Sequence, residues 1–289
     1  MTRPITVGVD GSPESAAAAA WAAREAVRRD RPLRIVHAWQ WEPYEIVPSA
    51  DRDAVAGWAR RTVDEARAAA TARHPELTVV AEAVEGPAVD LLVAEAAGAD
   101  LLVLGSRGHG AVVGFLVGSV GQQVIAEAAG PVVLVRSDDR PAAEAAGREV
   151  VVGQHGAPED GARALEVAFA AAAARGADLR VVRAWSLPPV FAYSPASMQL
   201  LDEAGGLEPI ERKALDEALE PWRKRFPRVR VIEHVEMGSA AQVLLSTAAD
   251  AQLVVVGRHA SRAVGPRVGS VAHALVHHAP CPVAVVPPA

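Results

Sequence analysis

The same set of sequence patterns occurs twice, in the same order, along this chain of 289 residues. The repeated stretches are VGVDGSPES (7–15) and VGQHGAPED (152–160), LRIVHAW (33–39) and LRVVRAW (179–185), LLVLG (101–105) and LVVVG (253–257), and VGSV at 117–120 and 268–271. The copies lie 145–152 residues apart, which is the size of a domain rather than of a solenoid repeat. The sequence therefore predicts two related domains, at 1–136 and 149–289, joined by a polar segment that contains a proline.

Within the first copy, short apolar segments alternate with helix-forming segments. The expected strands are ITVGVD, LRIVHAW, LTVVAEA, DLLVLG and PVVLVR, and residues 52–73 are the longest expected helix. The helix after the first strand has Ser12 at its N-cap position and Pro13 in its first turn. Strands that alternate with helices predict an α/β fold, with two tandem open parallel five-stranded sheets covered by helices on both faces.

Composition and charge exclude several classes of function. The net charge is −6 and the isoelectric point is near 5.9, which argues against binding to nucleic acid or to an anionic membrane. No apolar run reaches the roughly 18 residues that a membrane span needs, and the first residues do not resemble a signal peptide. The single cysteine, Cys281, cannot form an intramolecular disulfide. We expect a cytoplasmic protein.

A glycine-rich segment, GSRGHGAVVGFLVGS (105–119), follows the fourth expected strand of the first copy. Ligands of open parallel sheets bind at the carboxyl ends of the strands, where the first and fourth strands end here. Glycines allow positive φ angles and close approach to an anion, and a helix N-terminus favours negative charge, so the segment predicts a phosphate site. Ser119 is expected at the N-cap. Neither lysine of the chain follows a glycine and G-x-G-x-x-G is missing after the first strand, which excludes a P-loop and the dinucleotide fingerprint.

The spacing Gly105-x2-Gly108-x9-Gly118-Ser119, together with VGVDGSPES, resembles the ATP-binding branch of the universal stress protein family in its tandem form. The resemblance covers nearly the whole chain. It implies a Rossmann-like sheet of strand order 3-2-1-4-5 in each domain, with ATP, and Mg2+ as an option, at its carboxyl edge. The resemblance implies that Mg2+ would be bound by the nucleotide and that Asp10 would contact it only in that way.

The resemblance also implies a role for individual residues of the first copy. The residues that would line the nucleoside are Gly8, Val9, Asp10, Ala38, Leu104 and Gly105. Among them, Asp10 would face the ribose or a phosphate-bound Mg2+, and the backbone of Ala38 would meet adenine. The residues that would hold the phosphates are Gly108, Gly118, Ser119 and Val120, with Arg107 as a nearby cation. The alternative for Asp10 is a plain cap at the start of a helix, and the alternative for the glycines is a loop that needs positive φ.

The second copy departs from this pattern. It has Gly257-x2-Ala260-x8-Gly269-Ser270, which is one residue shorter, and His155 stands where the first copy has Asp10. A histidine cannot replace a carboxylate at Mg2+. We therefore expect a degenerate nucleotide loop in the second domain, and tight ATP binding only in the first.

No group of residues can be assigned to a chemical step, so no catalytic residue is predicted. The function that the sequence favours is an ATP-binding regulatory protein of the stress response. A slow ATPase or nucleotidyl-type enzyme at the same site is one alternative, and an interaction module that needs no nucleotide is another. We expect the last strands of the two copies, PVVLVR and PVAVVP, to pair as an internal pseudo-dimer, and a further homodimer stays open.

Three histidines and the cysteine lie close together near the end of the second copy. His273 and His277 are four residues apart on an expected helix, with His278 and Cys281 nearby. Such spacing is compatible with a metal site, but histidines near a helix C-terminus also interact favourably with the helix dipole. We favour the second interpretation.

Overall fold

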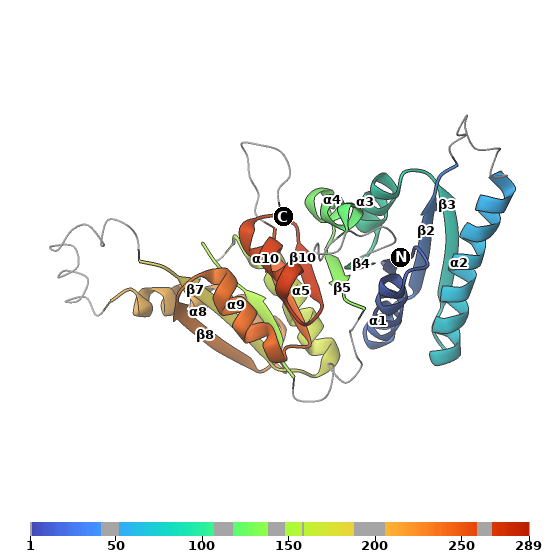
Figure 1. Cartoon of the computed structure of the whole chain (residues 1–289). Helices are drawn as coiled ribbons and strands as arrows, with labels where there is room; N and C mark the ends of the chain where they lie inside the picture. The colour runs from blue at the N-terminus through green and yellow to red at the C-terminus, as the bar shows by residue number, and fades with distance from the viewer. Residues whose placement is uncertain are drawn as a thin grey trace. The chain divides into compact units, whose positions relative to one another are not determined.

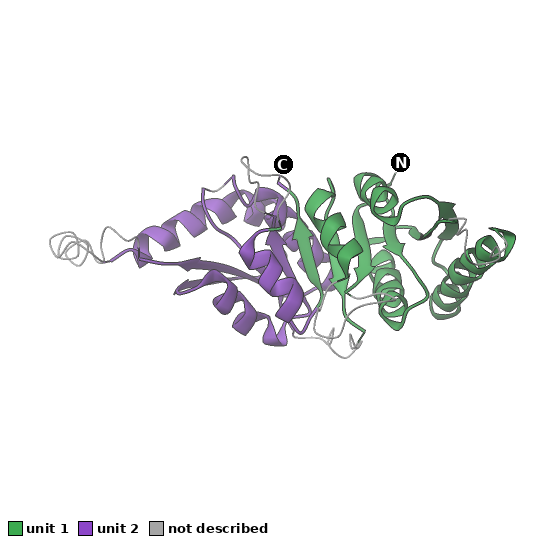
Figure 2. Ribbon diagram, turned by 45° about the horizontal axis from the view of Figure 1, so that its top comes forward, with its two compact units in different colours: residues 1–140, 261–268, 282–287 green, residues 141–260, 269–281, 288–289 purple. Residues whose placement is uncertain are grey.

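The computed structural model describes residues 2–41, 52–106, 118–137, 148–157, 159–187, 206–258 and 268–288. They form two compact units in which strands and helices alternate (Figures 1 and 2). Unit 1 contains residues 1–140, 261–268 and 282–287, and unit 2 contains residues 141–260, 269–281 and 288–289.

Unit 1 follows the order of elements that the sequence predicts. Its elements are β1 (Ile5–Gly8), α1 (Pro13–Arg29), β2 (Leu33–Trp39), α2 (Arg52–Arg73), β3 (Val79–Glu85), α3 (Ala88–Gly98), β4 (Leu101–Gly105), α4 (Ser119–Glu127) and β5 (Val132–Val135), together with β10 (Val283–Val286). The strands lie in the order β3-β2-β1-β4-β5-β10, and the first five are parallel. The predicted α/β class and the predicted order 3-2-1-4-5 are confirmed for this unit.

Unit 2 repeats most of the same arrangement. Its elements are β6 (Val150–Gly153), α5 (Ala162–Arg175), β7 (Leu179–Trp185), α8 (Glu208–Arg225), β8 (Val231–Met237), α9 (Ala240–Thr247), the 3-10 helix η2 (Ala248–Asp250), β9 (Leu253–Gly257) and α10 (Ser270–His278). Its four strands are parallel and lie in the order β9-β6-β7-β8.

The fifth strand of the second copy, β10, lies in unit 1. It pairs antiparallel with β5, with Val283 opposite Leu134 and Val285 opposite Val132. The predicted pairing of PVVLVR with PVAVVP is thus confirmed, whereas two separate five-stranded sheets are not formed. Both strands are buried along their whole length. Their pairing covers two apolar sheet edges that would otherwise expose unpaired backbone groups.

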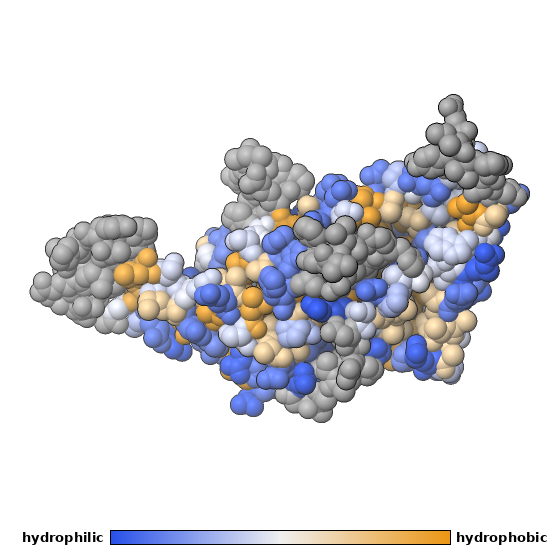
Figure 3. Space-filling view, viewed as in Figure 1, coloured by the Kyte–Doolittle hydropathy of each residue, from blue (hydrophilic) through white to orange (hydrophobic). Residues whose placement is uncertain are grey.

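Each unit has a core of aliphatic and aromatic side chains between its sheet and its helices. Fully buried residues of unit 1 include Ile5, Trp21, Leu33, Ile35 and Leu101, and those of unit 2 include Leu165, Phe169, Leu179, Leu215 and Leu253. On the face shown in Figure 3, apolar residues in orange form small groups among polar residues in blue. Among the described helices, none combines the length and the hydropathy that a bilayer span requires.

Candidate functional site

At the carboxyl edge of the sheet in unit 1, the neighbouring strands β1 and β4 end side by side. His37 and Arg34 point to opposite faces of β2, where they contact Trp58 of α2 and Glu95 of α3, so α2 and α3 cover opposite faces. Helix α1 packs with α2, and α4 packs with α3. The neighbouring strands β1 and β4 therefore lead into helices on opposite faces, which is the switch point where open α/β sheets bind ligands.

Gly8 and Gly105 end these two strands, and close packing against backbone requires glycine at 105, whereas Gly8 faces only the ends of leucine side chains. A Cβ atom at Gly8 would lie 2.7 Å from Cδ2 of Leu104 and 2.9 Å from Cδ2 of Leu92. A Cβ atom at Gly105 would lie 2.8 Å from the carbonyl carbon of Glu14, in the first turn of α1. Neither glycine has a positive φ, so the expectation of a conformational requirement is wrong at these positions. Their role is to let α1 and the core approach the strand ends.

Asp10 follows β1 and is oriented by the start of α1. Its Oδ1 accepts hydrogen bonds from the backbone N–H of Ser12 at 3.0 Å and from the Ser12 hydroxyl at 2.5 Å. Ser12 is the N-cap of α1, as predicted, and its Oγ accepts from the backbone N–H of Ser15 at 3.1 Å. Asp10 is therefore not the cap itself, and its half-buried carboxylate is held at the carboxyl edge by the cap residue.

Val9 is held on both sides by β2. Its N–H donates to the Val36 carbonyl at 2.9 Å, and its carbonyl accepts from Nδ1 of His37 at 2.6 Å. The His37 ring is buried and meets Trp58 edge-on at 5.1 Å. The sequence analysis missed His37, although a histidine within the strand segment LRIVHAW was a visible signal. Ala38 follows it and is half-buried near the end of β2.

Backbone hydrogen bonds join the two described ends of the glycine loop. The N–H of Ser106 donates to the Val135 carbonyl at 2.8 Å, and the N–H of Gly118 donates to the Ser106 carbonyl at 3.1 Å. The two described ends of the loop thus meet beside β4, with Leu104 buried beneath them. Arg107 and Gly108 lie outside the described residues.

The N-cap of helix α4 lies one residue earlier in the sequence than expected. Gly118 is the N-cap, with φ −68° and ψ 156°, and Ser119 is the first helical residue. No side chain of the described residues caps this helix, and both Ser119 and Val120 are exposed. The prediction of Ser119 as N-cap is therefore wrong. Within the part of the chain that the structure describes, the first-turn amides of α4 have no side-chain acceptor, and such a helix end favours an anion.

The corresponding edge of unit 2 is occupied by a buried guanidinium. Arg183 stands where unit 1 has His37, and its Nη1 donates to Oε1 of Gln154 and, at 3.1 Å, to the Gly156 carbonyl. Its Nε donates to Glu211 of α8 at 2.6 Å. Arg183 and Gln154 are both buried. The sequence analysis missed this network, although the repeat comparison already shows His37 replaced by Arg183 and Val9 by Gln154.

The backbone at the start of the equivalent helices also differs. Gly269, the N-cap of α10, has φ +82°, whereas Gly118 has φ −68°. Among the described residues, a Cβ atom at Gly257 would meet nothing within 4 Å, so the close packing against backbone seen at Gly105 is not found there at the end of β9. Ala260 lies outside the described residues. The two edges are thus different structures despite their related sequences.

Comparison with known proteins agrees with this arrangement. The model of the universal stress protein family matches residues 1–136 and 147–287. A universal stress protein of Mycobacterium tuberculosis strain H37Rv is 35% identical over 306 aligned residues, which cover 97% of this chain and 94% of that protein. One of Mycolicibacterium smegmatis is 34% identical over 296 residues, covering 98% and 97%. The chain also resembles the crystal structure of a universal stress protein from Archaeoglobus fulgidus, with a TM-score of 0.69 at 16% identity over 100% of both chains, which supports the fold.

Proposed function

Because the chain belongs to the universal stress protein family, we propose that it is a regulatory protein of the stress response that binds ATP at the carboxyl edge of unit 1. The observation that carries this proposal is the hydrogen bond between Gly118 and Ser106, at 3.1 Å. It brings the N-terminus of α4 to the end of β4, next to the strand that leads into Asp10. An anion-binding helix end and a switch point of the sheet therefore coincide.

On the nucleoside side, the proposal assigns contacts to residues at the ends of β1, β2 and β4. Asp10 accepts from the ribose hydroxyls, and its orientation by Ser12 means that it does not have to be ordered when the nucleotide binds. The backbone of Ala38 faces adenine, and Gly8, Val9, Leu104 and Gly105 border the nucleoside. His37 supports this side indirectly, because it holds the carbonyl of Val9 next to Asp10.

On the phosphate side, backbone amides do most of the binding. The N–H groups of the first turn of α4, at Ser119 and Val120, point toward an anion together with the positive end of the helix dipole. Gly118 lets the phosphates approach the chain, and the Ser119 hydroxyl adds a donor. Arg107 and Gly108 belong to the same proposed set.

Mg2+ fits this site as a companion of the nucleotide. Among the described residues, no cluster of three or more histidine, cysteine, aspartate or glutamate side chains is arranged to hold a metal. Magnesium commonly takes one or two protein carboxylates and completes its shell with phosphates and water. Asp10 is a carboxylate of that kind, and it would add an oxygen ligand to a metal that the phosphates carry.

The proposed site has no assigned catalytic group, so turnover of ATP is expected to be slow. Phosphoryl transfer needs positioned cations and an oriented water molecule. Arg107 and His109 are the two candidates within the glycine loop, and both lie outside the described residues. A slow ATPase or nucleotidyl-type activity at the same site remains the second candidate function, and a phosphate-release assay separates the two.

We assign nucleotide binding to unit 1 and not to unit 2. In unit 2, Arg183 and Gln154 connect the end of β7 to the loop after β6, and His155 replaces Asp10. A buried arginine that already has three acceptors stabilises this edge by itself. A ligand would have to displace those hydrogen bonds.

The direct test of the proposal is mass spectrometry of small molecules released when the purified full-length protein is denatured. We expect ATP, or adenine nucleotides derived from it, in the wild type and a strong reduction in Gly118→Val. A protein that releases no adenine nucleotide and does not bind added ATP would contradict the proposal.

A further inference from the structure

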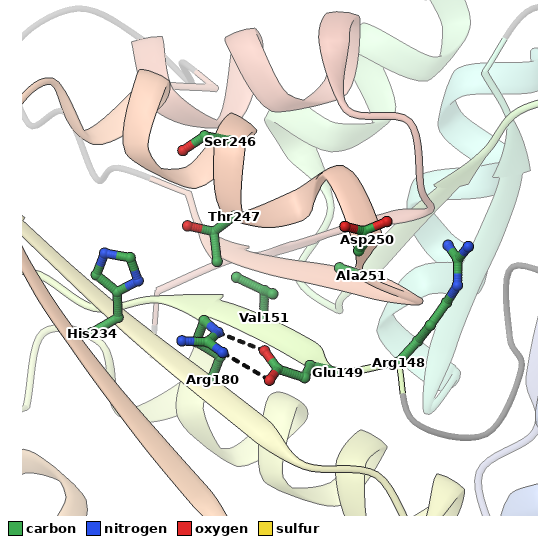
Figure 4. Close-up of a pocket in the computed structure, with 9 residues that line it drawn as sticks. All are labelled: Arg148, Glu149, Val151, Arg180, His234, Ser246, Thr247, Asp250 and Ala251. Carbon is green, nitrogen blue, oxygen red and sulfur yellow. Dashed lines mark hydrogen bonds and ion pairs between the residues drawn. The ribbon is translucent and has the colours of Figure 1, made fainter.

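Unit 2 has a pocket of about 460 Å³ at the amino ends of its strands, between the strands and the segment of α9 and η2 (Figure 4). Glu149 binds Arg180, and its carboxylate lies between Arg180 and Arg148. Asp250 lies beside Arg148. Because groups of opposite charge alternate along this lining, they do not form one subsite for a single ionic ligand. In unit 1, by contrast, a buried histidine acts on one backbone group at the proposed nucleotide site.

His37 holds the peptide unit that joins Val9 to Asp10. Its Nδ1 lies 2.6 Å from the Val9 carbonyl oxygen, and a carbonyl can only accept a hydrogen bond, so Nδ1 carries the proton. The N–H of the same peptide unit, which belongs to Asp10, donates to Oγ of Ser15 in α1 at 3.3 Å. This peptide unit is therefore held at both ends, from β2 and from α1.

Further hydrogen bonds continue from Ser15 to the Asp10 side chain. The Ser15 hydroxyl donates to the Ser12 carbonyl at 2.9 Å, and Ser12 donates from its N–H and its hydroxyl to Oδ1 of Asp10. Because a peptide unit is planar, holding its carbonyl and its N–H also fixes the Cα atom from which the carboxylate of Asp10 extends. The direction of this carboxylate thus depends on a hydrogen bond that comes from the neighbouring strand.

The other ring nitrogen of His37, Nε2, makes the residue costly to bury. Nε2 is buried and, within the part of the chain that the structure describes, has no hydrogen-bond partner. Burial of an unpaired polar atom is unfavourable, and an apolar side chain of similar size would avoid it. An apolar side chain would not supply the donor that Nδ1 offers to the Val9 carbonyl. The histidine is therefore better explained by this one hydrogen bond than by packing.

The described part of the second copy has a different arrangement. Arg183 stands at the position of His37 and donates to the Gly156 carbonyl at 3.1 Å. That carbonyl is two residues beyond the one that corresponds to the carbonyl of Val9. The residue at the position of the Asp10 carboxylate is His155. The histidine on the second strand and the carboxylate after the first strand thus occur together, in the copy to which we assign nucleotide binding.

We propose that His37 is a positioning residue of the nucleotide site, whose Nδ1–H holds the Val9–Asp10 peptide unit so that the Asp10 carboxylate is set toward the ribose before the nucleotide binds. The inference rests on the proposed function, because it states how the nucleoside side of that site is preorganised. His37 acts through Asp10 and does not itself contact the nucleotide. Preorganisation avoids an ordering cost on binding, so its loss lowers the affinity without removing a direct contact.

Asparagine and glutamine form a matched pair of substitutions at His37. The amide nitrogen of asparagine is as many bonds from Cβ as Nδ1 of histidine, whereas the amide nitrogen of glutamine corresponds to Nε2. Both variants lose the ring and its contact with Trp58, so a purely structural role would affect them equally. In calorimetry of the full-length protein, we expect His37→Asn to bind ATP within about threefold of the wild type and His37→Gln to bind it at least about tenfold more weakly.

Two further measurements locate the effect at Asp10. In an Asp10→Ala background no carboxylate remains to be positioned, so His37→Gln should then change the ATP affinity by less than about threefold. Without nucleotide, the Asp10 amide should exchange with solvent at least about fivefold faster in His37→Gln than in the wild type or His37→Asn. Ser15→Ala releases the other end of the same peptide unit, and it should raise the exchange rate and lower the ATP affinity if the histidine variants do not fold.

The proposal is overturned if His37→Asn and His37→Gln bind ATP equally, or if His37→Gln costs as much affinity in the Asp10→Ala background as in the wild type. It is also overturned if the Asp10 amide exchanges at the same rate in both variants. A wild type that binds no ATP contradicts the proposed function. In that case, unequal exchange rates would still support the holding of the peptide unit by Nδ1, and equal rates would overturn it as well.

Discussion

Gly118 and Gly269 are the N-caps of equivalent helices, but their backbone φ angles differ. The same substitution at the two positions therefore serves as a matched comparison. The φ angle of Gly118, −68°, is accessible to any residue, whereas that of Gly269, +82°, is strained for any side chain. We predict that Gly118→Ala changes the free energy of unfolding by less than about 1 kcal/mol, and that Gly269→Ala lowers it by about 1–2 kcal/mol. Thermal and denaturant unfolding of both variants measure this. Equal effects would show that the two helix starts have the same conformation.

Asp10 has two roles that one substitution can separate. Its Oδ1 accepts two hydrogen bonds from Ser12, and an asparagine oxygen can still accept them, so Asp10→Asn keeps the start of α1 but removes the charge. We predict that this variant melts like the wild type and binds Mg2+–ATP about tenfold more weakly, roughly 1.4 kcal/mol. Binding of ATP in the presence of a chelator should change less. If the loss is the same with and without Mg2+, the carboxylate does not act on the metal.

At the scale of single elements, a buried ion pair within α1 continues to Asp100, the residue before β4. Glu25 is fully buried and binds Nε of Arg29 at 2.6 Å, and Nη1 of Arg29 binds Asp100 at 3.0 Å. We predict that Arg29→Ala destabilises the protein by about 1–3 kcal/mol, because Glu25 loses one of its charged partners in the core and keeps Arg28, at 3.5 Å. The control is Arg67→Ala, which removes an exposed pair with Asp64 and should cost less than about 1 kcal/mol. Similar costs in denaturant unfolding would contradict this account.

Helix α10 has a cluster of histidines that makes stability depend on pH. Burial lowers the pKa of His277 below its ordinary value of 6.5, and neighbouring His273 and His278 lower it further. The His273 and His277 rings are 4.3 Å apart. The unfolded chain therefore takes up a proton at His277 before the folded chain does, so stability is full above about pH 6.5 and decreases as the pH falls below it.

The measurement is the melting temperature between about pH 8 and about pH 5 for the wild type and His277→Gln. We predict that the wild type loses more stability over this range than the variant does. If the two curves are parallel, His277 does not contribute to the pH dependence.

At the scale of the whole molecule, the repeat pattern predicts the architecture. It predicts the order of elements, the helix at 52–73 and the pairing of β5 with β10. These follow from apolar periodicity and from the need to cover sheet edges, which are local or generic properties.

Other features could not be predicted because they depend on contacts between distant residues. The need for glycine at 105 comes from the backbone of Glu14, and the closed edge of unit 2 comes from Arg183, Gln154 and Glu211 meeting.

The central claim is that the chain has one ATP site and that it lies in unit 1. Calorimetric titration of ATP into the full-length protein, with and without Gly118→Val, tests it most directly. The separated copies are less suitable, because β10 of the second copy pairs with β5 of the first. We predict one ATP bound per chain in the wild type and none in Gly118→Val, with the melting temperature unchanged. Two equivalent sites, or one site that survives Gly118→Val, would contradict the account.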